Sequence, residues 1–169
     1  MSEKEKKPCS ASHTVKTAQI LPPDANQYGT LFGGRLMAHI DDVAAIAAVR
    51  HARKSVVTAS TDSVDFLHPV TVGDSICVEG FVTSSHHTSM EVFIKVIREG
   101  LLTGEEKVCA TAFLTFVALD EEKKPAEVPE IYPETEIEKM LFAGADLRKD
   151  RRNERKKESQ RMATLFKSN

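Results

Sequence analysis

The sequence predicts an α+β fold in which one long central helix is wrapped by a curved antiparallel sheet of about five to six strands. From Gly33 to about His51, apolar side chains cover most of a helix, and such a helix has to be buried on nearly all sides. Four segments rich in Val, Ile, Thr and Phe follow with short connections, which favour antiparallel pairing. A single sheet can bury this helix only by curling around it.

The elements can be justified in chain order. Residues 12–21 alternate moderately and end at Pro22-Pro23, which predicts a first strand. Residues 24–30 form a loop, and the helix that follows would be about 28 Å long. Gly73-Asp74 separates the first two of the later strands, so we expect a hairpin there. The expected later strands are Val56–Phe66, Ser75–Ser85, Thr88–Glu99 and Lys107–Leu119.

Composition excludes several classes of protein. The 169 residues carry a net charge of only −2, whereas a nucleic-acid-binding protein would be strongly basic, so we expect no nucleic-acid partner. The three cysteines form no C-x-x-C pair, and the histidines lack metal-ligand spacing, so we expect no metal site. The polar N-terminus does not resemble a signal peptide, and the longest apolar run, Val43 to Val49, is too short to span a membrane. These features indicate a cytoplasmic protein.

The small net charge conceals two regions of opposite sign. Residues 146–169 contain nine Lys or Arg and four Asp or Glu, a net +5, which leaves −7 for residues 1–145. Residues 120–138 are acidic and contain three prolines, which is typical of a linker, and helices are expected at 134–142 and 144–166. The predicted organisation is a flexible N-terminus (1–11), one domain (12–120), and an acidic linker with a basic, helical tail (121–169). The tail is either a solvated helix or a binding surface for an anion or a partner.

The residues that could perform chemistry are concentrated around the start of the apolar helix. The first N–H groups of a helix lack internal partners, so those at Gly33-Gly34 could stabilise an oxyanion, although the glycines could equally serve only a tight turn. Asp41 lies among small and apolar residues of the helix, where a carboxylate can act as a general base or nucleophile. Asp42 points about 100° away and is the more ordinary of the pair. By themselves, Asn26 is consistent with a turn and Thr58 with an ordinary strand position.

Three segments together resemble a known family. They are N-Q-Y-G-T-L-F-G-G-R-L-M-A-H-I-D-D-V-A from Asn26, V-V-T-A-S-T-D-S-V-D-F from Val56, and H-P-V-x-x-G-D from His68. This long pattern resembles the hotdog-fold acyl-CoA thioesterases, the bacterial acyl-CoA thioester hydrolases related to the cytosolic long-chain acyl-CoA hydrolases of animals. The resemblance covers roughly residues 12–120. It implies hydrolysis of fatty acyl-CoA to the free acid and CoA, with CoA as part of the substrate and no separate cofactor.

The resemblance also assigns roles to residues. It implies that Asn26, Asp41 and Thr58 are catalytic, with Asn26 of one subunit facing the other two residues across a dimer interface, and that Gly33 and Gly34 bind the thioester carbonyl. The dimers would assemble into a trimer of dimers, a homohexamer. Candidate partners for the CoA phosphates are Ser85, Thr88, Lys95 and Arg98.

Two alternatives remain at this stage. The first is an acyl-CoA sensor on the same fold that binds without catalysis, although a retained Asp41 has little purpose in a pure binder. The second is a hotdog dehydratase acting on hydroxyacyl thioesters, which needs a histidine paired with an acid. His39 is two residues before Asp41, so the two side chains diverge on a helix, which disfavours the dehydratase.

Overall fold

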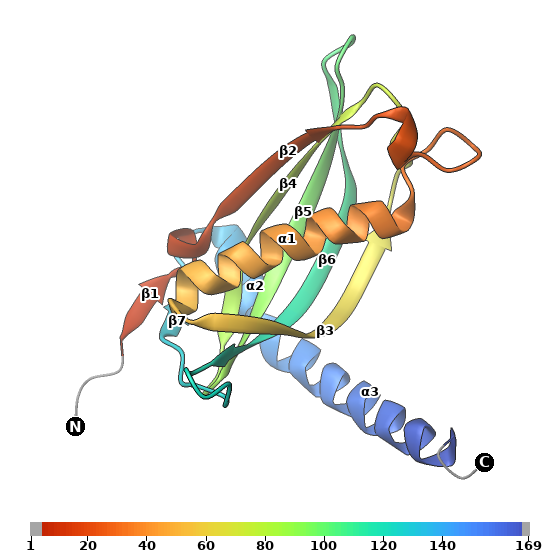
Figure 1. Ribbon diagram of the computed structural model, residues 1–169. Coiled ribbons are helices and arrows are strands. Elements are labelled where there is room, and N and C mark those ends of the chain that lie inside the picture. Colours follow the sequence, from red (N-terminus) through yellow and green to blue (C-terminus); the bar gives the residue numbers. More distant parts are fainter. Residues whose placement is uncertain (1–4, 167–169) are drawn as a thin grey trace.

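The computed structural model describes residues 5–166 and contains one long helix held in a curved antiparallel sheet (Figure 1). The sheet has five strands in the order β2-β4-β5-β6-β3, and α1 crosses its concave face. This is the hotdog arrangement that the sequence predicts. The helices are α1 (Gly33–Ala52), α2 (Glu136–Ala143) and α3 (Ala145–Phe166), with short 3-10 turns η1 (Cys9–Ser12) and η2 (Pro22–Asp24). The strands are β1 (Lys6–Pro8), β2 (Thr14–Gln19), β3 (Ser55–Phe66), β4 (Ser75–Ser85), β5 (Ser89–Gly100), β6 (Glu105–Leu119) and β7 (Glu130–Tyr132).

The core lies between α1 and the concave face of the sheet. Small side chains on α1, among them Ala44, Ala47 and Ala48, are fully buried, so the sheet can approach the helix closely. Gly80 on β4 serves the same contact, because a Cβ there would lie 2.2 Å from a side-chain carbon of Ile94. The predicted limits of α1 and of the four long strands agree with the structure to within two residues. The prediction that α1 is buried on nearly all sides is wrong for the single chain: one face of α1 packs against the sheet, whereas Met37, Ile46 and Val49 on its other side are exposed.

The order of the strands differs from the expectation in one respect. β3 and β4 do not form a hairpin: β3 pairs antiparallel with β6 at one edge of the sheet, while β4 lies next to β2 at the other. The connection between them is long, and it is held against the core by the buried Val70, whose carbonyl accepts a hydrogen bond from Leu31 N. A hairpin needs a tight turn, and this anchored segment instead carries the chain across the sheet.

The N-terminal segment is also more ordered than the predicted flexible arm of residues 1–11. From Lys6 onward it forms β1, which pairs in parallel with β7, and the turn η1. Cys9 and Ser12 in η1 are fully buried, and Ser12 Oγ accepts a hydrogen bond from Val82 N of β4 at 2.8 Å. This burial holds the segment in place, whereas residues 1–4 of the predicted arm lie outside the described residues.

The C-terminal segment returns to the convex face of the sheet and then leaves it (Figure 1). The Glu138 side chain and the Thr135 hydroxyl form a capping box that begins α2. At the start of α3, Arg148 makes two hydrogen bonds to the buried Glu91, of 2.9 and 2.8 Å, and stacks 4.3 Å from the centre of the Phe113 ring. The helices expected at 134–142 and 144–166 are therefore present as α2 and α3. Between residues 5 and 166, no helix is long and apolar enough to cross a membrane.

Candidate active site

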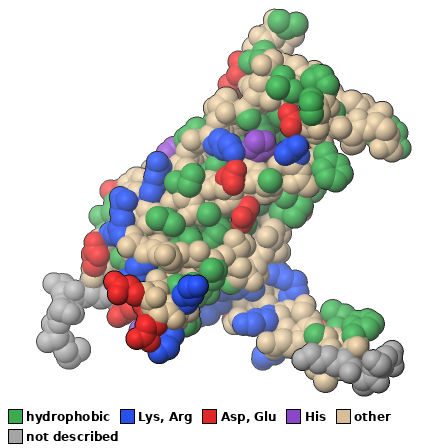
Figure 2. Space-filling model, in the orientation of Figure 1, with side chains coloured by type: hydrophobic (Ala, Val, Ile, Leu, Met, Phe, Trp, Pro, Cys, Tyr) green, Lys and Arg blue, Asp and Glu red, His purple; other side chains and the backbone are tan. Residues whose placement is uncertain are grey.

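The structure brings Asp41 and Thr58 together. Asp41 lies in the third turn of α1, and Thr58 lies on β3, the edge strand that runs beside this helix. Thr58 Oγ1 donates a hydrogen bond of 3.0 Å to Asp41 Oδ1. This leaves Oδ2 of a half-buried carboxylate available to a further donor such as water. Figure 2 shows acidic and hydrophobic side chains next to one another on the face that α1 presents.

Asp42, the neighbour of Asp41, has a different partner. Its Oδ2 accepts a hydrogen bond of 2.7 Å from Lys16 Nζ on β2, and its side chain is exposed. The two carboxylates therefore face different sides of α1, about 100° apart, as adjacent positions on a helix require. The Lys16–Asp42 pair joins the helix to β2, which is a structural role.

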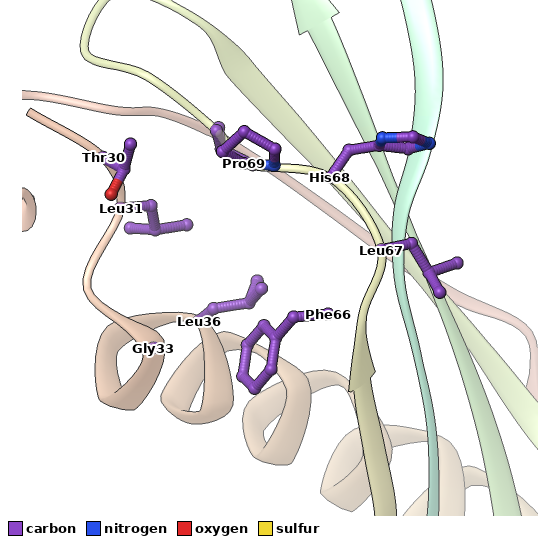
Figure 3. Close-up of a pocket in the computed structure, with 9 residues that line it drawn as sticks. Thr30, Leu31, Gly33, Leu36, Phe66, Leu67, His68 and Pro69 are labelled. Atoms are coloured by element: carbon purple, nitrogen blue, oxygen red, sulfur yellow. The ribbon is translucent and has the colours of Figure 1, made fainter.

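A cleft opens beside the first turn of α1. It has a volume of about 370 Å³ and lies between the loop before the helix and the end of β3. In Figure 3, the Phe66 ring points toward the first turns of α1, whereas His68 points away from them. Gly33 lines the cleft, and the Phe32 side chain makes no capping hydrogen bond to the helix. No side chain of the described residues caps the N–H groups that begin α1. They lie at the edge of an apolar cleft, where they could donate hydrogen bonds to a carbonyl oxygen.

The second glycine has a steric role in the same turn. A Cβ at Gly34 would lie 2.8 Å from a carbon of the Phe32 ring, so the missing side chain makes room for that ring. A Cβ at Gly33 would make only ordinary contact with Phe66, at 3.6 Å. The turn geometry therefore accounts for the glycine at 34 but not for the glycine at 33.

Asn26 organises the loop that precedes α1 and is not bonded to Asp41 or Thr58 of the same chain. Its Oδ1 accepts hydrogen bonds from Tyr28 N at 2.9 Å and from Thr30 Oγ1 at 3.1 Å. Gly29 closes the loop with a φ of 73°, a conformation that favours glycine. The loop thus fixes the Asn26 amide oxygen, and its Nδ2 group, which can only donate, has no acceptor in the loop.

The four residues predicted to contact CoA phosphates do not form one group. Arg98 Nε donates to Asp74 Oδ2 at 2.7 Å, which holds the turn before β4, and Arg98 lies at the far end of β5 from the β4–β5 hairpin. Lys95 Nζ lies 3.4 Å from Glu79 on the neighbouring strand. Ser85 ends β4, and only Thr88 of the four lines a basic cleft described next.

This basic cleft lies between α3 and the convex face of the sheet and has a volume of about 460 Å³. Hydroxyl groups of Ser60, Thr88, Ser89 and Thr115 line its floor, and four cations from α3, Lys149, Arg152, Arg155 and Lys156, line its wall. Asp62 accepts a 2.6 Å hydrogen bond from Arg155 and lies 3.8 Å from Arg152. Within the described range, Lys156 has no acidic partner, so the cleft carries an excess of positive charge.

The sequence contains a signal for this cleft that residue-by-residue reasoning missed. Lys149, Arg152 and Lys156 are spaced by three and four positions, so they share one face of a helix. The hydroxyl groups on the floor of the cleft come from β3, from β5 and the residue before it, and from β6. They could not be grouped before the sheet order was known.

The dehydratase alternative needs a histidine paired with an acid, and the structure shows how His39 lies relative to Asp41. His39 and Asp41 are not hydrogen-bonded to each other, and His39 Nδ1 is buried without a partner in the part of the chain that the structure describes. Burial lowers the pKa of His39, with the nearby Lys16 acting in the same direction. No group of three or more His, Cys, Asp or Glu side chains that could hold a metal ion occurs among residues 5–166.

Comparison with known proteins identifies the family. Residues 28–105 match the thioesterase superfamily. The uncharacterized acyl-CoA thioester hydrolase YkhA of Bacillus subtilis is 52% identical over 166 residues, which are 98% of this chain and 96% of that protein. The chain belongs to the thioesterase superfamily. The cytosolic acyl coenzyme A thioester hydrolase of Rattus norvegicus is 37% identical to this thioesterase over 72% of the chain, which corresponds to 32% of the rat protein.

Solved structures agree with this thioesterase over nearly its whole length. The acyl-CoA hydrolase of Staphylococcus aureus, in complex with butyryl coenzyme A, coenzyme A and coenzyme A disulfide, has a TM-score of 0.92 and 42% identity, covering 96% of this chain and 99% of that one. A hexameric acyl-CoA thioesterase has a TM-score of 0.87 and 49% identity, covering 89% and 97%. For the S. aureus enzyme, structures also exist of three variants in which an asparagine, an aspartate or a threonine is replaced by alanine.

Proposed function

We propose that this thioesterase hydrolyses fatty acyl-CoA to the free fatty acid and CoA, with Asp41 as the general base or nucleophile. The observation that carries the proposal is the Thr58–Asp41 hydrogen bond at the surface of an otherwise apolar helix, beside a cleft that begins at the uncapped end of that helix. The high identity to acyl-CoA thioester hydrolases over the full chain supports the substrate class.

The spacing of three residues supports their role. In the S. aureus enzyme, the substituted asparagine lies 15 positions before the substituted aspartate, which lies 17 positions before the substituted threonine. Asn26, Asp41 and Thr58 have the same residue types at the same spacings. We therefore infer that these three residues form the catalytic group of this protein.

The chemistry follows from these groups. The N–H groups at Gly33 and Gly34 and the Nδ2 group of Asn26 donate to the thioester carbonyl oxygen and stabilise the oxyanion. Thr58 occupies one Asp41 oxygen, and the other takes a proton from the attacking water. The oxygen of that water forms a bond to the carbonyl carbon, the C–S bond breaks, and the proton held by Asp41 passes to the leaving thiolate. In the alternative route an Asp41 oxygen attacks the carbonyl carbon, the C–S bond breaks and the CoA thiolate leaves. Water then hydrolyses the resulting anhydride to the free acid and the Asp41 carboxylate, and its proton passes to the thiolate. Neither route needs a metal or a separate cofactor.

We infer that the catalytic group is complete only in a dimer. Asn26 lies in the loop before α1 and makes no hydrogen bond to Asp41 or Thr58 of its own chain, which supports a role at the Asp41–Thr58 pair of the partner subunit. Exposed apolar side chains around this pair support such an interface: Met37, Ile46 and Val49 on α1 and Val57 on β3. Hexameric relatives support assembly of the dimers into a trimer of dimers. The rat relative is a cytosolic enzyme, which favours a cytoplasmic location for this protein.

The basic cleft fits the phosphates of CoA. Its four cations and four hydroxyl groups match a multiply charged anion, and Ala59 and Ser60 on its floor directly follow Thr58 in β3. We assign Thr88 together with Lys149, Arg152 and Lys156 to this role. Arg98 and Lys95 already have acidic partners elsewhere on the sheet, which makes them weaker candidates.

Replacing Asp41 with asparagine tests the proposal. Thiol release should be measured from acyl-CoAs of graded chain length with wild type and Asp41→Asn. Loss of a general base lowers kcat about 10²- to 10⁴-fold, whereas CoA binding should persist. The matched control is Asp42→Asn, because Asp42 is the adjacent carboxylate, faces Lys16 on another side of α1 and should affect kcat little.

Two outcomes would contradict the proposal. Undiminished release by Asp41→Asn would remove Asp41 from the mechanism. No release by wild type on any chain length, despite binding of acyl-CoA, would favour a sensor over an enzyme.

A further inference from the structure

The end of α3 carries a small apolar group that projects away from the rest of the chain. Met162, Leu165 and Phe166 are 44%, 67% and 80% exposed, and their spacing places them on one side of the last two turns. Figure 2 shows hydrophobic side chains gathered at the end of this projecting helix. We call these three residues the α3 tip.

The helix between the body and the tip is polar on every side. From Arg148 to Arg161 each side chain is polar or charged, over about 21 Å of helix. The ion pairs that join α3 to the sheet end at Arg155. A helix that is polar all round has no apolar stripe for a membrane surface, and beyond Arg155 no ion pair in the described structure holds α3 to its own sheet. The apolar tip is therefore the part of α3 that is suited to docking.

A cleft of matching character lies on the convex face of the sheet. It has a volume of about 340 Å³, and Phe81 of β4, Phe93 of β5 and Ile137 of α2 form its apolar part, with polar side chains such as Glu79 and Lys95 around them. The two phenylalanine rings meet edge to face with their centres 6.1 Å apart, and Ile137 is 64% exposed. We call this the α2 cleft. It can accept a few apolar side chains that stand on one side of a helix.

The tip of a chain cannot reach the α2 cleft of the same chain. α3 begins two residues after α2 ends and then runs about 33 Å in a straight line away from it (Figure 1). Any tip that enters the cleft must therefore belong to another copy. Hexameric relatives of this length show that chains of this shape assemble beyond a dimer.

We propose that the α3 tip of one subunit inserts into the α2 cleft of a subunit in a neighbouring dimer. The proposal rests on the trimer of dimers in the proposed function and identifies the contact that joins one dimer to the next. The polar length of α3 sets the distance between the two bodies, and the apolar groups at its end are buried by the contact. This contact is separate from the α1–β3 face assigned to the dimer.

The first test compares assembly masses by light scattering after size-exclusion chromatography. Wild type should be hexameric, and both Met162→Asp/Phe166→Asp and Ile137→Asp should fall to dimers, because a charge on either side prevents burial of the contact. The matched control is Leu102→Asp, an apolar-to-acid change at the fully exposed tip of the β5–β6 hairpin, which should remain hexameric. Circular dichroism and thiol release confirm that the variants are folded.

A second measurement keeps the proposal testable if a charged variant misfolds. The double variant Ile137→Cys/Phe166→Cys should form disulfide-linked oligomers under mild oxidation, whereas each single variant should not. A wild-type dimer would contradict the proposed trimer of dimers. A hexamer that survives the tip substitutions would overturn the docking contact alone. Loss of binding to anionic vesicles in the tip variant, with an unchanged mass, would also overturn it and favour a membrane contact.

Discussion

Asp41 and Asp42 are adjacent in sequence, yet their partners give them different roles. Asp42 accepts a hydrogen bond from the Lys16 ammonium group at 2.7 Å, which commits its charge to holding α1 against β2. Asp41 accepts from the neutral Thr58 hydroxyl, and no cation lies within ion-pair distance of it among residues 5–166. One carboxylate is thus occupied by a cation, and the other keeps an oxygen for water. Thr58 occupies Oδ1 of Asp41, so Oδ2 is the oxygen that can accept a hydrogen bond from water.

Replacing Thr58 with valine should slow hydrolysis without weakening binding. The hydroxyl group orients a carboxylate, and a hydrogen bond to a charged group contributes about 1.5–3 kcal/mol, which corresponds to about a 10- to 150-fold fall in kcat. KM should change little, because Thr58 does not line the basic cleft. Steady-state kinetics of Thr58→Val beside the control Thr61→Val check this. Equal effects of the two substitutions would show that β3 is merely sensitive to lost hydroxyl groups.

Within β3, two irregularities decide which face each side chain takes. The register with β6 shifts between Thr58 and Ser60 and again between Thr61 and Ser63. Thr58 therefore faces α1, whereas Ser60 pairs with Thr115 on the convex face. Asp62, two residues after Ser60, lies on the same convex face, where Thr115 donates to it at 2.7 Å. The β3 strand consequently carries the candidate catalytic residue on one face and the anchor of α3 on the other.

The sequence predicted the elements better than their connections. The apolar pattern of residues 33–52 defines α1, because the helix carries apolar side chains both on the face that packs against the sheet and on its exposed face. In a regular strand, Thr58, Ser60 and Asp62 would share one face, and nothing local in the segment reveals the two shifts. Asp41 stood out as a carboxylate on an apolar helix, whereas the role of Thr58 came only from the resemblance to a family, since their meeting requires knowledge of which edge β3 occupies. The strand order could not be inferred for the same reason.

The C-terminal end of α1 contains a histidine that makes folding stability depend on pH. His51 is fully buried, and its Nε2 donates to the carbonyl of Pro129 at 2.9 Å, while Nδ1 is buried without a partner among the described residues. Burial lowers the pKa of His51 in the folded chain, so the unfolded chain binds protons more readily below about pH 6.5. Stability should therefore fall as the pH falls through this range.

Replacing His51 with glutamine should reduce this pH dependence. The glutamine amide can still donate to Pro129 but cannot take up a proton. Urea denaturation of wild type between about pH 7.5 and about pH 5.5 should give a falling midpoint, and His51→Gln should give a shallower fall. Burial also lowers the pKa of His39 and His86, so part of the slope should remain. An unchanged slope in His51→Gln, matching the exposed control His68→Gln, would assign the effect to other groups.

At the scale of the whole molecule, charge is distributed unevenly. The last 24 residues carry +5, and the rest of the chain carries −7. Four of these cations line one cleft on the convex face, whereas the rest of α3 is largely exposed to solvent. An otherwise acidic protein thus presents one positive region, which would attract an anionic substrate and repel it elsewhere.

This arrangement predicts that substrate capture depends on salt. Raising the ionic strength from about 0.01 to about 0.15 M shortens the Debye length from about 30 to about 8 Å, so KM for acyl-CoA should rise while kcat stays constant. Lys156→Glu should raise KM several-fold at low salt and flatten its salt dependence, because Lys156 lines the cleft and, like Lys149, has no acidic partner in the described structure. The control is Lys157→Glu. It replaces the next lysine along the chain, which does not line the cleft, by the same acidic residue. If both variants shifted KM equally, net charge alone would be responsible; if only Lys156→Glu did, the cleft would be the site that receives the phosphates.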